Sequence, residues 1–187
     1  MMRLFIALPL EKNVEEELGR IISTLKQKGG SVKWVKPENI HVTLRFLGDT
    51  DEDLVDKIKS EIDAAVASHH QVPTSISTLG GFPNLRRPRV IWVGIEKNLE
   101  MLRKMAKDVE HRMRSLRFEK EKKSFKAHLT LGRVRNPKGL EGLAEFMEGY
   151  SLEEIPLLFD RIVLFKSTLT PQGPIYERLH EAKLLAQ

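Results

Sequence analysis

The sequence contains no cysteine among its 187 residues. A disulfide framework, a thiol nucleophile and a thiolate metal site are therefore all excluded. Long apolar runs are missing as well. The stretch Met1–Pro9 is too short for the core of a signal peptide, and no segment reaches the roughly 20 apolar residues of a membrane-spanning helix. We therefore expect a cytoplasmic protein that does not enter a membrane.

Aromatic residues are scarce, at 6% of the chain, but hydrophobic residues make up 41% and charged residues 30%. This balance is typical of a folded globular protein and excludes an intrinsically disordered one. A length of 187 residues fits one domain or two closely packed lobes. Lysine and arginine exceed the acidic residues, 31 to 26, which gives a net charge of +5 and favours a polyanionic partner without identifying it.

Helix and strand patterns succeed one another with no low-complexity linker between them. Apolar residues at every third or fourth position predict helices, and β-prone stretches between Gly- and Pro-rich turns predict strands. The expected helices are 11–28, 50–68, 99–116 and 139–149. The expected strands are 2–8, 32–35, 40–47, 72–79, 89–95, 125–134, 155–164 and 175–182. Several strands follow one another directly, so we expect an α+β fold of largely antiparallel sheets with helices packed outside.

One four-residue pattern, His-x-Thr-Leu, occurs twice. It stands at residues 41–44 and again, 87 residues later, at 128–131, each time inside an expected strand. A shuffled chain of this composition would contain about 0.03 such matches, so chance is a poor explanation of two. Because side chains alternate across a strand, each histidine shares a face with its threonine, opposite the apolar neighbours. The repeat predicts two imidazole–hydroxyl pairs that face one groove between two lobes.

Two imidazoles at one groove suit acid–base chemistry, because a histidine with an unperturbed pKa of about 6.5 exists in both protonation states near neutral pH. His41 and His128 would divide the two roles, and Thr43 and Thr130 would supply the donors that phosphodiester hydrolysis needs for the non-bridging oxygens. Two other interpretations stay open. Each histidine could be a structural strand residue, or the pair could belong to a metal site. A metal site is disfavoured because His-x-Thr has no third and fourth ligand nearby.

At these motifs the chain resembles the two-histidine (2H) phosphoesterase superfamily, and within it the RNA 2′,3′-cyclic phosphodiesterases, formerly called 2′-5′ RNA ligases. The similarity covers nearly the whole chain and includes the segments 3–8, 34–48, 88–94, 125–133, 167–169 and 173–176. One departure is Ala127, where many members of the family carry proline. The resemblance implies a single domain over 1–187, made of two intertwined lobes with pseudo-two-fold symmetry. In it, two mainly antiparallel sheets line a central cleft.

The resemblance also implies a reaction, the opening of a 2′,3′-cyclic phosphate at an RNA end, tRNA fragments included, to a 2′-phosphate. It implies no metal, no other cofactor and no obligate protein partner. In this reaction His41 would donate a proton to the leaving 3′ oxygen and His128 would accept one from water. Thr43, Thr130 and Arg133 would hold the phosphate. The reverse reaction would join RNA through a 2′-5′ linkage.

The positions of two arginines along the motif strands decide whether their side chains face this site. Arg133 lies five residues after His128, so strict alternation would turn it to the opposite face unless Gly132 allows a bulge or the strand ends there. Arg45 shares the parity of the first motif and could reach RNA, although a solvated strand arginine is the simpler interpretation.

Other candidate RNA contacts are aromatic or basic. Tyr176, beside a Pro-Gly turn, is the best candidate for stacking on a base, whereas the spacing of Phe46 predicts burial in the core. Arg86 and Arg87 in a loop, and the lysines of 120–123, would guide a phosphate backbone, although short basic runs are usually solvated surface.

Two alternatives to RNA hydrolysis stay open. A non-catalytic RNA- or nucleotide-binding module would use the same cleft as a phosphate pocket, but it has no need of a matched acid and base. A related enzyme would act instead on a small cyclic phosphate or on a 2′-5′ oligonucleotide.

Overall fold

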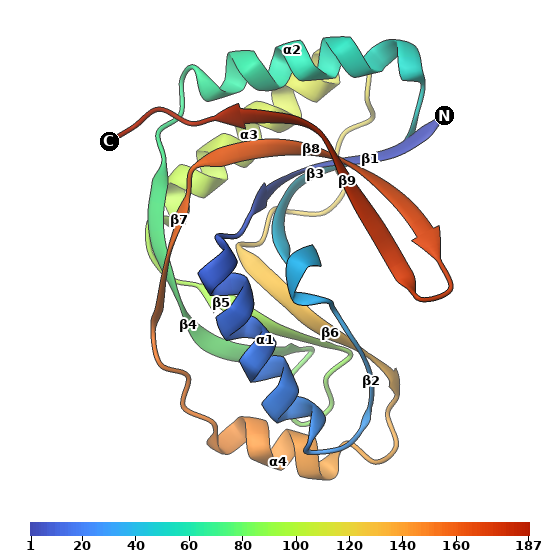
Figure 1. Cartoon of the computed structure of the whole chain (residues 1–187), viewed down its shortest axis with the longest axis vertical. Helices are drawn as coiled ribbons and strands as arrows, with labels where there is room; N and C mark the ends of the chain where they lie inside the picture. Colours follow the sequence, from blue (N-terminus) through green and yellow to red (C-terminus); the bar gives the residue numbers. More distant parts are fainter.

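The computed structural model describes the whole chain, residues 1–187 (Figure 1). The strands are β1 (Met2–Pro9), β2 (Ser31–Trp34), β3 (His41–Thr50), β4 (Val72–Phe82), β5 (Val90–Ile95), β6 (His128–Asn136), β7 (Ile155–Phe159), β8 (Arg161–Thr170) and β9 (Gly173–Lys183). The helices are α1 (Lys12–Lys26), α2 (Val55–Val66), α3 (Leu99–Ser115) and α4 (Glu141–Gly149), with 3-10 turns η1 (Pro37–Asn39) and η2 (Glu52–Leu54). None of the helices combines the length and the apolar character needed to cross a membrane.

The smaller sheet has four antiparallel strands in the order β3-β1-β8-β9. On its inner strand β1, Ile6 and Leu8 are buried in the main core, to which α2 and α3 contribute, while Phe5 and Ala7 point to the opposite face. That face carries a second, small apolar cluster: Phe5, Ala7, Val163 and Phe165. The smaller sheet therefore has one face covered by helices and one face free to form a site.

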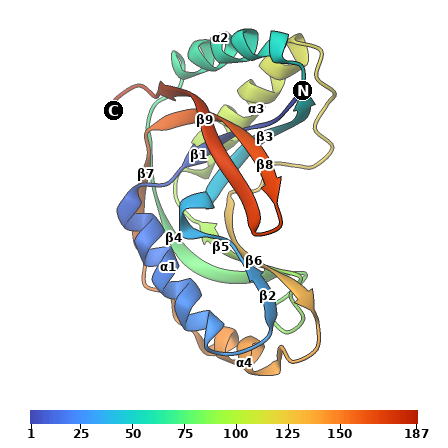
Figure 2. The same ribbon diagram turned by 45° about the vertical axis from the view of Figure 1, so that its right-hand side comes forward.

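The larger sheet has five antiparallel strands in the order β2-β6-β5-β4-β7. On β5, Ile91, Val93 and Ile95 are buried in the main core, whereas Val90 and Trp92 point to the other face and are only partly buried. In Figures 1 and 2, α1 and α4 lie at the end of the molecule that holds this sheet, and α2 and α3 lie at the other end. Each sheet thus has its own pair of helices.

α1 shows how an apolar stripe fixes a helix. Val14, Leu18 and Leu25 recur near one face and are fully buried. The helix ends before Gly29 and Gly30, whose φ angles of 90° and 85° would strain a residue with a side chain. These two glycines let the chain reverse directly into β2, which leads to the first motif.

The prediction of an α+β fold with two mainly antiparallel sheets is confirmed, but one predicted strand is divided. The apolar run over 155–164 predicts a single strand, and the structure breaks it at Asp160 into β7 and β8. β7 pairs with β4 in the larger sheet, and β8 pairs with β1 in the smaller. At the crossing, the Asp160 carbonyl accepts a hydrogen bond from the N–H of Leu184 at 2.8 Å. Both sheets therefore draw strands from both halves of the chain.

Candidate active site

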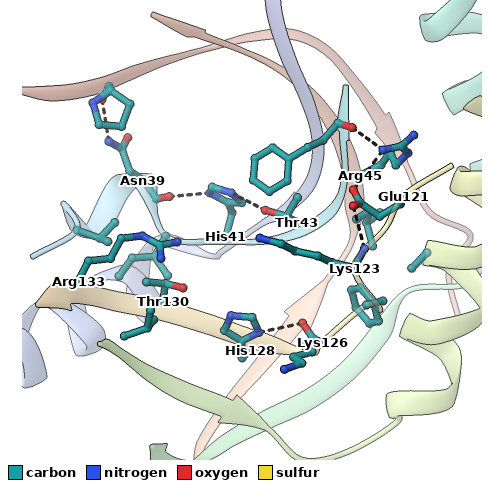
Figure 3. Close-up of a pocket in the computed structure, with 18 of the residues that line it drawn as sticks. Asn39, His41, Thr43, Arg45, Glu121, Lys123, Lys126, His128, Thr130 and Arg133 are labelled. Carbon is teal, nitrogen blue, oxygen red and sulfur yellow. Dashed lines mark hydrogen bonds and ion pairs between the residues drawn. The ribbon is translucent and has the colours of Figure 1, made fainter. Parts of the chain in front are cut away.

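The two motifs face one cleft between the sheets, with a volume of about 1170 Å³. His41 and Thr43 come from β3 of the smaller sheet, and His128 and Thr130 come from β6 of the larger. Figure 3 shows the two pairs on opposite sides of the same space. Small-molecule pockets usually enclose about 300–1000 Å³, so this cleft is larger than a typical small-molecule site.

Both histidines are held in the same way. The Nδ1–H group of His41 donates to the backbone carbonyl of Asn39 at 2.7 Å, and that of His128 donates to the carbonyl of Lys126 at 3.1 Å. In each case the acceptor lies two residues before the histidine. A proton fixed at Nδ1 leaves Nε2 unprotonated in the neutral ring, so Nε2 is the atom available for proton transfer on both sides of the cleft.

His41 lies among aromatic rings. Its ring centroid is 4.8 Å from that of Phe5 and 5.5 Å from that of Tyr176. Burial lowers the pKa of His41 to about 4, because it disfavours the charged imidazolium, and the Asn39 carbonyl offsets only part of this effect. The Nε2 atom lies 3.0 Å from Oγ1 of Thr43, whose hydroxyl donates to the neutral ring. His41 is therefore neutral in the unliganded protein near pH 7.

His128 lies in less deeply buried and more positive surroundings. Its ring meets Phe82 edge to face, at a centroid distance of 5.7 Å. Burial lowers the pKa of His128, the charges of Lys126 and Arg133 lower it further, and the hydrogen bond to the Lys126 carbonyl opposes them. Both histidines thus favour the neutral form, His41 through burial alone and His128 through burial together with two cations.

A β-bulge after the second motif brings Arg133 onto the cleft face. Adjacent residues of β5 pair with Thr130 and Gly132, which leaves Leu131 as the extra residue of β6. The alternation shifts by one, so Arg133 shares the face of Thr130 and lines the cleft. From the sequence we expected either a bulge at Gly132 or the end of the strand there. β6 continues to Asn136, and the extra residue lies one position before Gly132.

The equivalent bulge in β3 falls on Leu44 and overturns the prediction for Arg45. Adjacent residues of β1 pair with Thr43 and Arg45, so Arg45 turns to the face covered by helices. Its side chain is only 7% exposed and forms ion pairs with Glu110 of α3 at 2.6 Å and with Glu121 at 3.2 Å. Arg45 is neither a solvated strand residue nor a free contact for RNA, because its guanidinium is engaged inside the protein.

Phe46 is a cleft residue that strict alternation assigns wrongly to the core. After the bulge it pairs with Phe5, lines the cleft, and is 58% exposed. It stands five residues after His41, as Arg133 stands five residues after His128. Aligning the two motif strands would have found Phe46, because a bulge inferred for one copy of a repeat applies equally to the other.

The remaining candidate RNA contacts divide between the cleft and the outer surface. Tyr176 on β9 lines the cleft, and burial raises the pKa of its phenol. Arg86 and Arg87 lie outside the cleft, in the loop between β4 and β5, where Arg86 pairs with Glu148 of α4 at 3.1 Å. The structure therefore does not bring these two arginines to the site. Nowhere in the chain do three or more His, Asp or Glu side chains form a group that could hold a metal ion.

Comparison with known families matches the chain twice to one model, that of a LigT-like phosphoesterase, over residues 8–92 and 93–176. The chain belongs to the LigT-like phosphoesterase family. Each matched half holds one His-x-Thr motif, so the repeat noticed in the sequence corresponds to two copies of one family unit. The resemblance drawn from the motif residues is thereby confirmed.

Relatives of this LigT-like phosphoesterase match it over nearly its full length. An RNA 2′,3′-cyclic phosphodiesterase of Methanocaldococcus jannaschii is 36% identical over 183 residues, which cover 96% of this chain and 99% of the relative. An RNA 2′,3′-cyclic phosphodiesterase of Thermotoga maritima is 34% identical over 97% of this chain and 95% of the relative. A crystal structure of a Thermus thermophilus protein is similar over 100% of both chains, with a TM-score of 0.80 at 24% identity. The structural match confirms the bilobal α+β fold.

Proposed function

We propose that this LigT-like phosphoesterase hydrolyses the 2′,3′-cyclic phosphate at the end of an RNA to a 2′-phosphate. The observation that carries the proposal is the matched pair of histidines in one cleft, each with its Nδ1 proton held by a carbonyl two residues earlier. Relatives that carry this activity in their names support the choice of substrate. A pocket that only binds phosphate has no use for two such proton acceptors.

His128 acts as the general base in this proposal. Its Nε2 atom accepts a proton from the water that attacks phosphorus. Lys126 and Arg133 disfavour a positive charge on the resting ring, so Nε2 is unprotonated when substrate arrives. The same two cations attract the anionic phosphate that the water attacks.

His41 acts as the general acid. Burial is the one influence that lowers its pKa, and no neighbouring cation contributes. A phosphate anion bound beside the ring supplies the missing counter-charge and raises this pKa. The ring then takes up a proton from solvent and delivers it to the leaving 3′ oxygen. Substrate binding and the protonation of His41 are therefore coupled.

Thr43, Thr130 and Arg133 hold the phosphate oxygens. In the resting protein the Thr43 hydroxyl donates to Nε2 of His41 at 3.0 Å, and protonation of that nitrogen frees the hydroxyl to donate to phosphate. Arg133 adds a charge-assisted contact. The bond from the water oxygen to phosphorus forms as the bond to the 3′ oxygen breaks, so the product carries a 2′-phosphate and a 3′-hydroxyl.

Three finer features belong to the same proposal. With the 5′-hydroxyl of another RNA in place of water, His128 would accept the proton of that hydroxyl and His41 would protonate the leaving 3′ oxygen, so a 2′-5′ linkage would form. All proton transfers proposed here use side chains of the chain itself, so the reaction needs no metal ion. tRNA fragments that end in a cyclic phosphate are candidate substrates.

Product analysis tests the proposal. A short RNA ending in a 2′,3′-cyclic phosphate is incubated with the protein and EDTA, and the expected product is the 2′-phosphate. A 3′-phosphate product would refute the assigned leaving group. A cyclic end that persists while the RNA binds in a salt-dependent manner would show a binding module instead.

A further inference from the structure

The cleft continues beyond the histidines along a segment rich in lysine. Residues 117–126, between α3 and β6, contribute Lys120, Lys122, Lys123 and Lys126 to its lining, and we call this segment the lysine arm. A second hollow of about 570 Å³ lies between the lysine arm and the end of β3. The two hollows share part of their lining, Phe46 included, so a groove leads from the motifs along the lysine arm.

Arg45 anchors the lysine arm to β3. Its guanidinium donates to the backbone carbonyl of Glu119 and pairs with the carboxylate of Glu121, both in the arm. Its Nε atom lies 2.6 Å from Glu110 of α3, and Glu110 also accepts a hydrogen bond from the N–H of Glu121 at 3.0 Å. The arm is therefore held from its buried side, and its lysines are not needed to hold it.

This anchor engages the acidic side chains of the cleft wall, and the second hollow adds only the carboxylates of Asp49 and Glu119. Glu110 and Glu121 are the only carboxylates that line the cleft, and both pair with Arg45. Lys107 of α3 lines the same wall as the lysine arm and adds a further cation. A terminal cyclic phosphodiester carries one negative charge, for which Arg133 on β6 is a sufficient partner. The wall thus holds more positive charge than the reacting phosphate can use.

We propose that the lysine arm and Lys107 bind backbone phosphates of the RNA on the 5′ side of its reacting end. This inference rests on the proposed function. In a strand that ends in a 2′,3′-cyclic phosphate, every other phosphate lies upstream, so the strand leaves the site on one side only. Contacts to phosphates carry no information about the bases. The lysine arm therefore selects an oligonucleotide over a mononucleotide without selecting its sequence.

The triple substitution Lys107→Ala, Lys120→Ala and Lys122→Ala tests this role. Lys123 and Lys126 are left in place, because Figure 3 shows Lys123 directed into the space between the motif strands and Lys126 beside His128. Two substrates are compared, a nucleoside 2′,3′-cyclic phosphate and an RNA oligonucleotide with the same end. The matched control removes three exposed lysines outside the cleft: Lys12→Ala, Lys57→Ala and Lys138→Ala.

The triple variant should lower kcat/KM for the oligonucleotide about tenfold or more. It should also make the slope of log kcat/KM against log salt concentration less negative by about 2. Each contact to a single-strand phosphate contributes about 0.7 to this slope, and three contacts are removed. Turnover of the mononucleotide should stay within about twofold, and the control triple should behave as wild type on both substrates. Equal losses on both substrates, or unchanged oligonucleotide kinetics, would overturn the proposal.

A comparison of a natural oligonucleotide with one that has an uncharged backbone isolates the effect of the backbone charge. An oligonucleotide with uncharged methylphosphonate linkages and the same cyclic end should lose the advantage of the natural oligonucleotide, and an undiminished advantage would count against phosphate contacts. If neither natural substrate is turned over, the proposed function fails by itself. The lysine arm is then tested by equilibrium binding of RNA with a 2′-phosphate end. Wild type must bind more tightly than the triple variant, and equal binding would overturn the inference.

Discussion

Phe46 and Arg133 occupy equivalent positions on the two sides of the cleft. Each lies five residues after a motif histidine, on a strand whose bulge at Leu44 or Leu131 turns it toward the cleft. One side thus presents an exposed aromatic face and the other a guanidinium. A terminal nucleotide offers a base and a phosphate, which suit these two kinds of contact, so we expect its base at Phe46 and its phosphate at Arg133.

Phe46→Ala should weaken substrate binding while leaving the chemical step intact. Stacking of a base on an aromatic side chain contributes about 1–3 kcal/mol, so KM for a nucleoside 2′,3′-cyclic phosphate should rise about fivefold or more. Steady-state kinetics on the variant measures this, with kcat expected to stay near wild type. Leu185→Ala, at an exposed apolar residue outside the cleft, is the control. An unchanged KM would contradict a stacking role.

The pH profiles of kcat/KM and kcat should differ on the alkaline side. The free protein has a pKa of about 4 at His41, and the acid role needs the protonated ring, so kcat/KM should fall as the pH rises. In the complex the bound phosphate raises the pKa of His41, so kcat should persist to higher pH. Both profiles are measured from about pH 4 to about pH 9. Alkaline limbs that coincide would show that substrate does not control this proton.

Substitution of the leaving atom separates the acid from the base. A substrate with sulfur in place of the 3′ oxygen leaves as a thiolate and needs no proton. His41→Ala should therefore recover about 10² in rate on the sulfur substrate relative to the oxygen substrate, whereas His128→Ala should recover little. Single-turnover rates on the two substrates give this comparison. Recovery in His128→Ala alone would reverse the roles assigned to the two histidines.

Arg45→Met should destabilise the protein and loosen the lysine arm. It leaves Glu110 and Glu121 facing each other without a cation, and the loss of one partner from a buried ion pair costs about 3 kcal/mol. Urea unfolding measures the change in the free energy of unfolding. Adding Glu110→Gln and Glu121→Gln should restore part of it by removing the unpaired charges. Unchanged stability in Arg45→Met would show that the anchor is not needed.

The principal site residues could be predicted from the sequence because they belong to a motif that occurs twice. His41 and His128 stand in identical four-residue patterns. Each is followed two positions later by a threonine, which alternation places on the same face of the strand. Over so short a distance no bulge intervenes, so simple alternation holds. The structure accordingly brings both pairs to one cleft.

Residues further along the same strands could not be placed by alternation. The bulge at Leu44 exchanges the expected faces of Arg45 and Phe46, burying the charged residue and exposing the aromatic one. The partners of Arg45 lie far along the chain, on α3 and in the lysine arm, so no local pattern reveals them. The break at Asp160 is hidden for a similar reason, since apolar residues on both sides of it are buried in different sheets.

The most direct test of this account compares wild type with His41→Ala, His128→Ala and the double variant on an RNA that ends in a 2′,3′-cyclic phosphate. If the two histidines act together as acid and base, each single substitution should lower kcat by about 10² or more. The double variant should lose about as much as the worse single variant, because the two side chains serve one reaction step. A single variant that retains the wild-type kcat, with an unchanged melting temperature, would contradict the account.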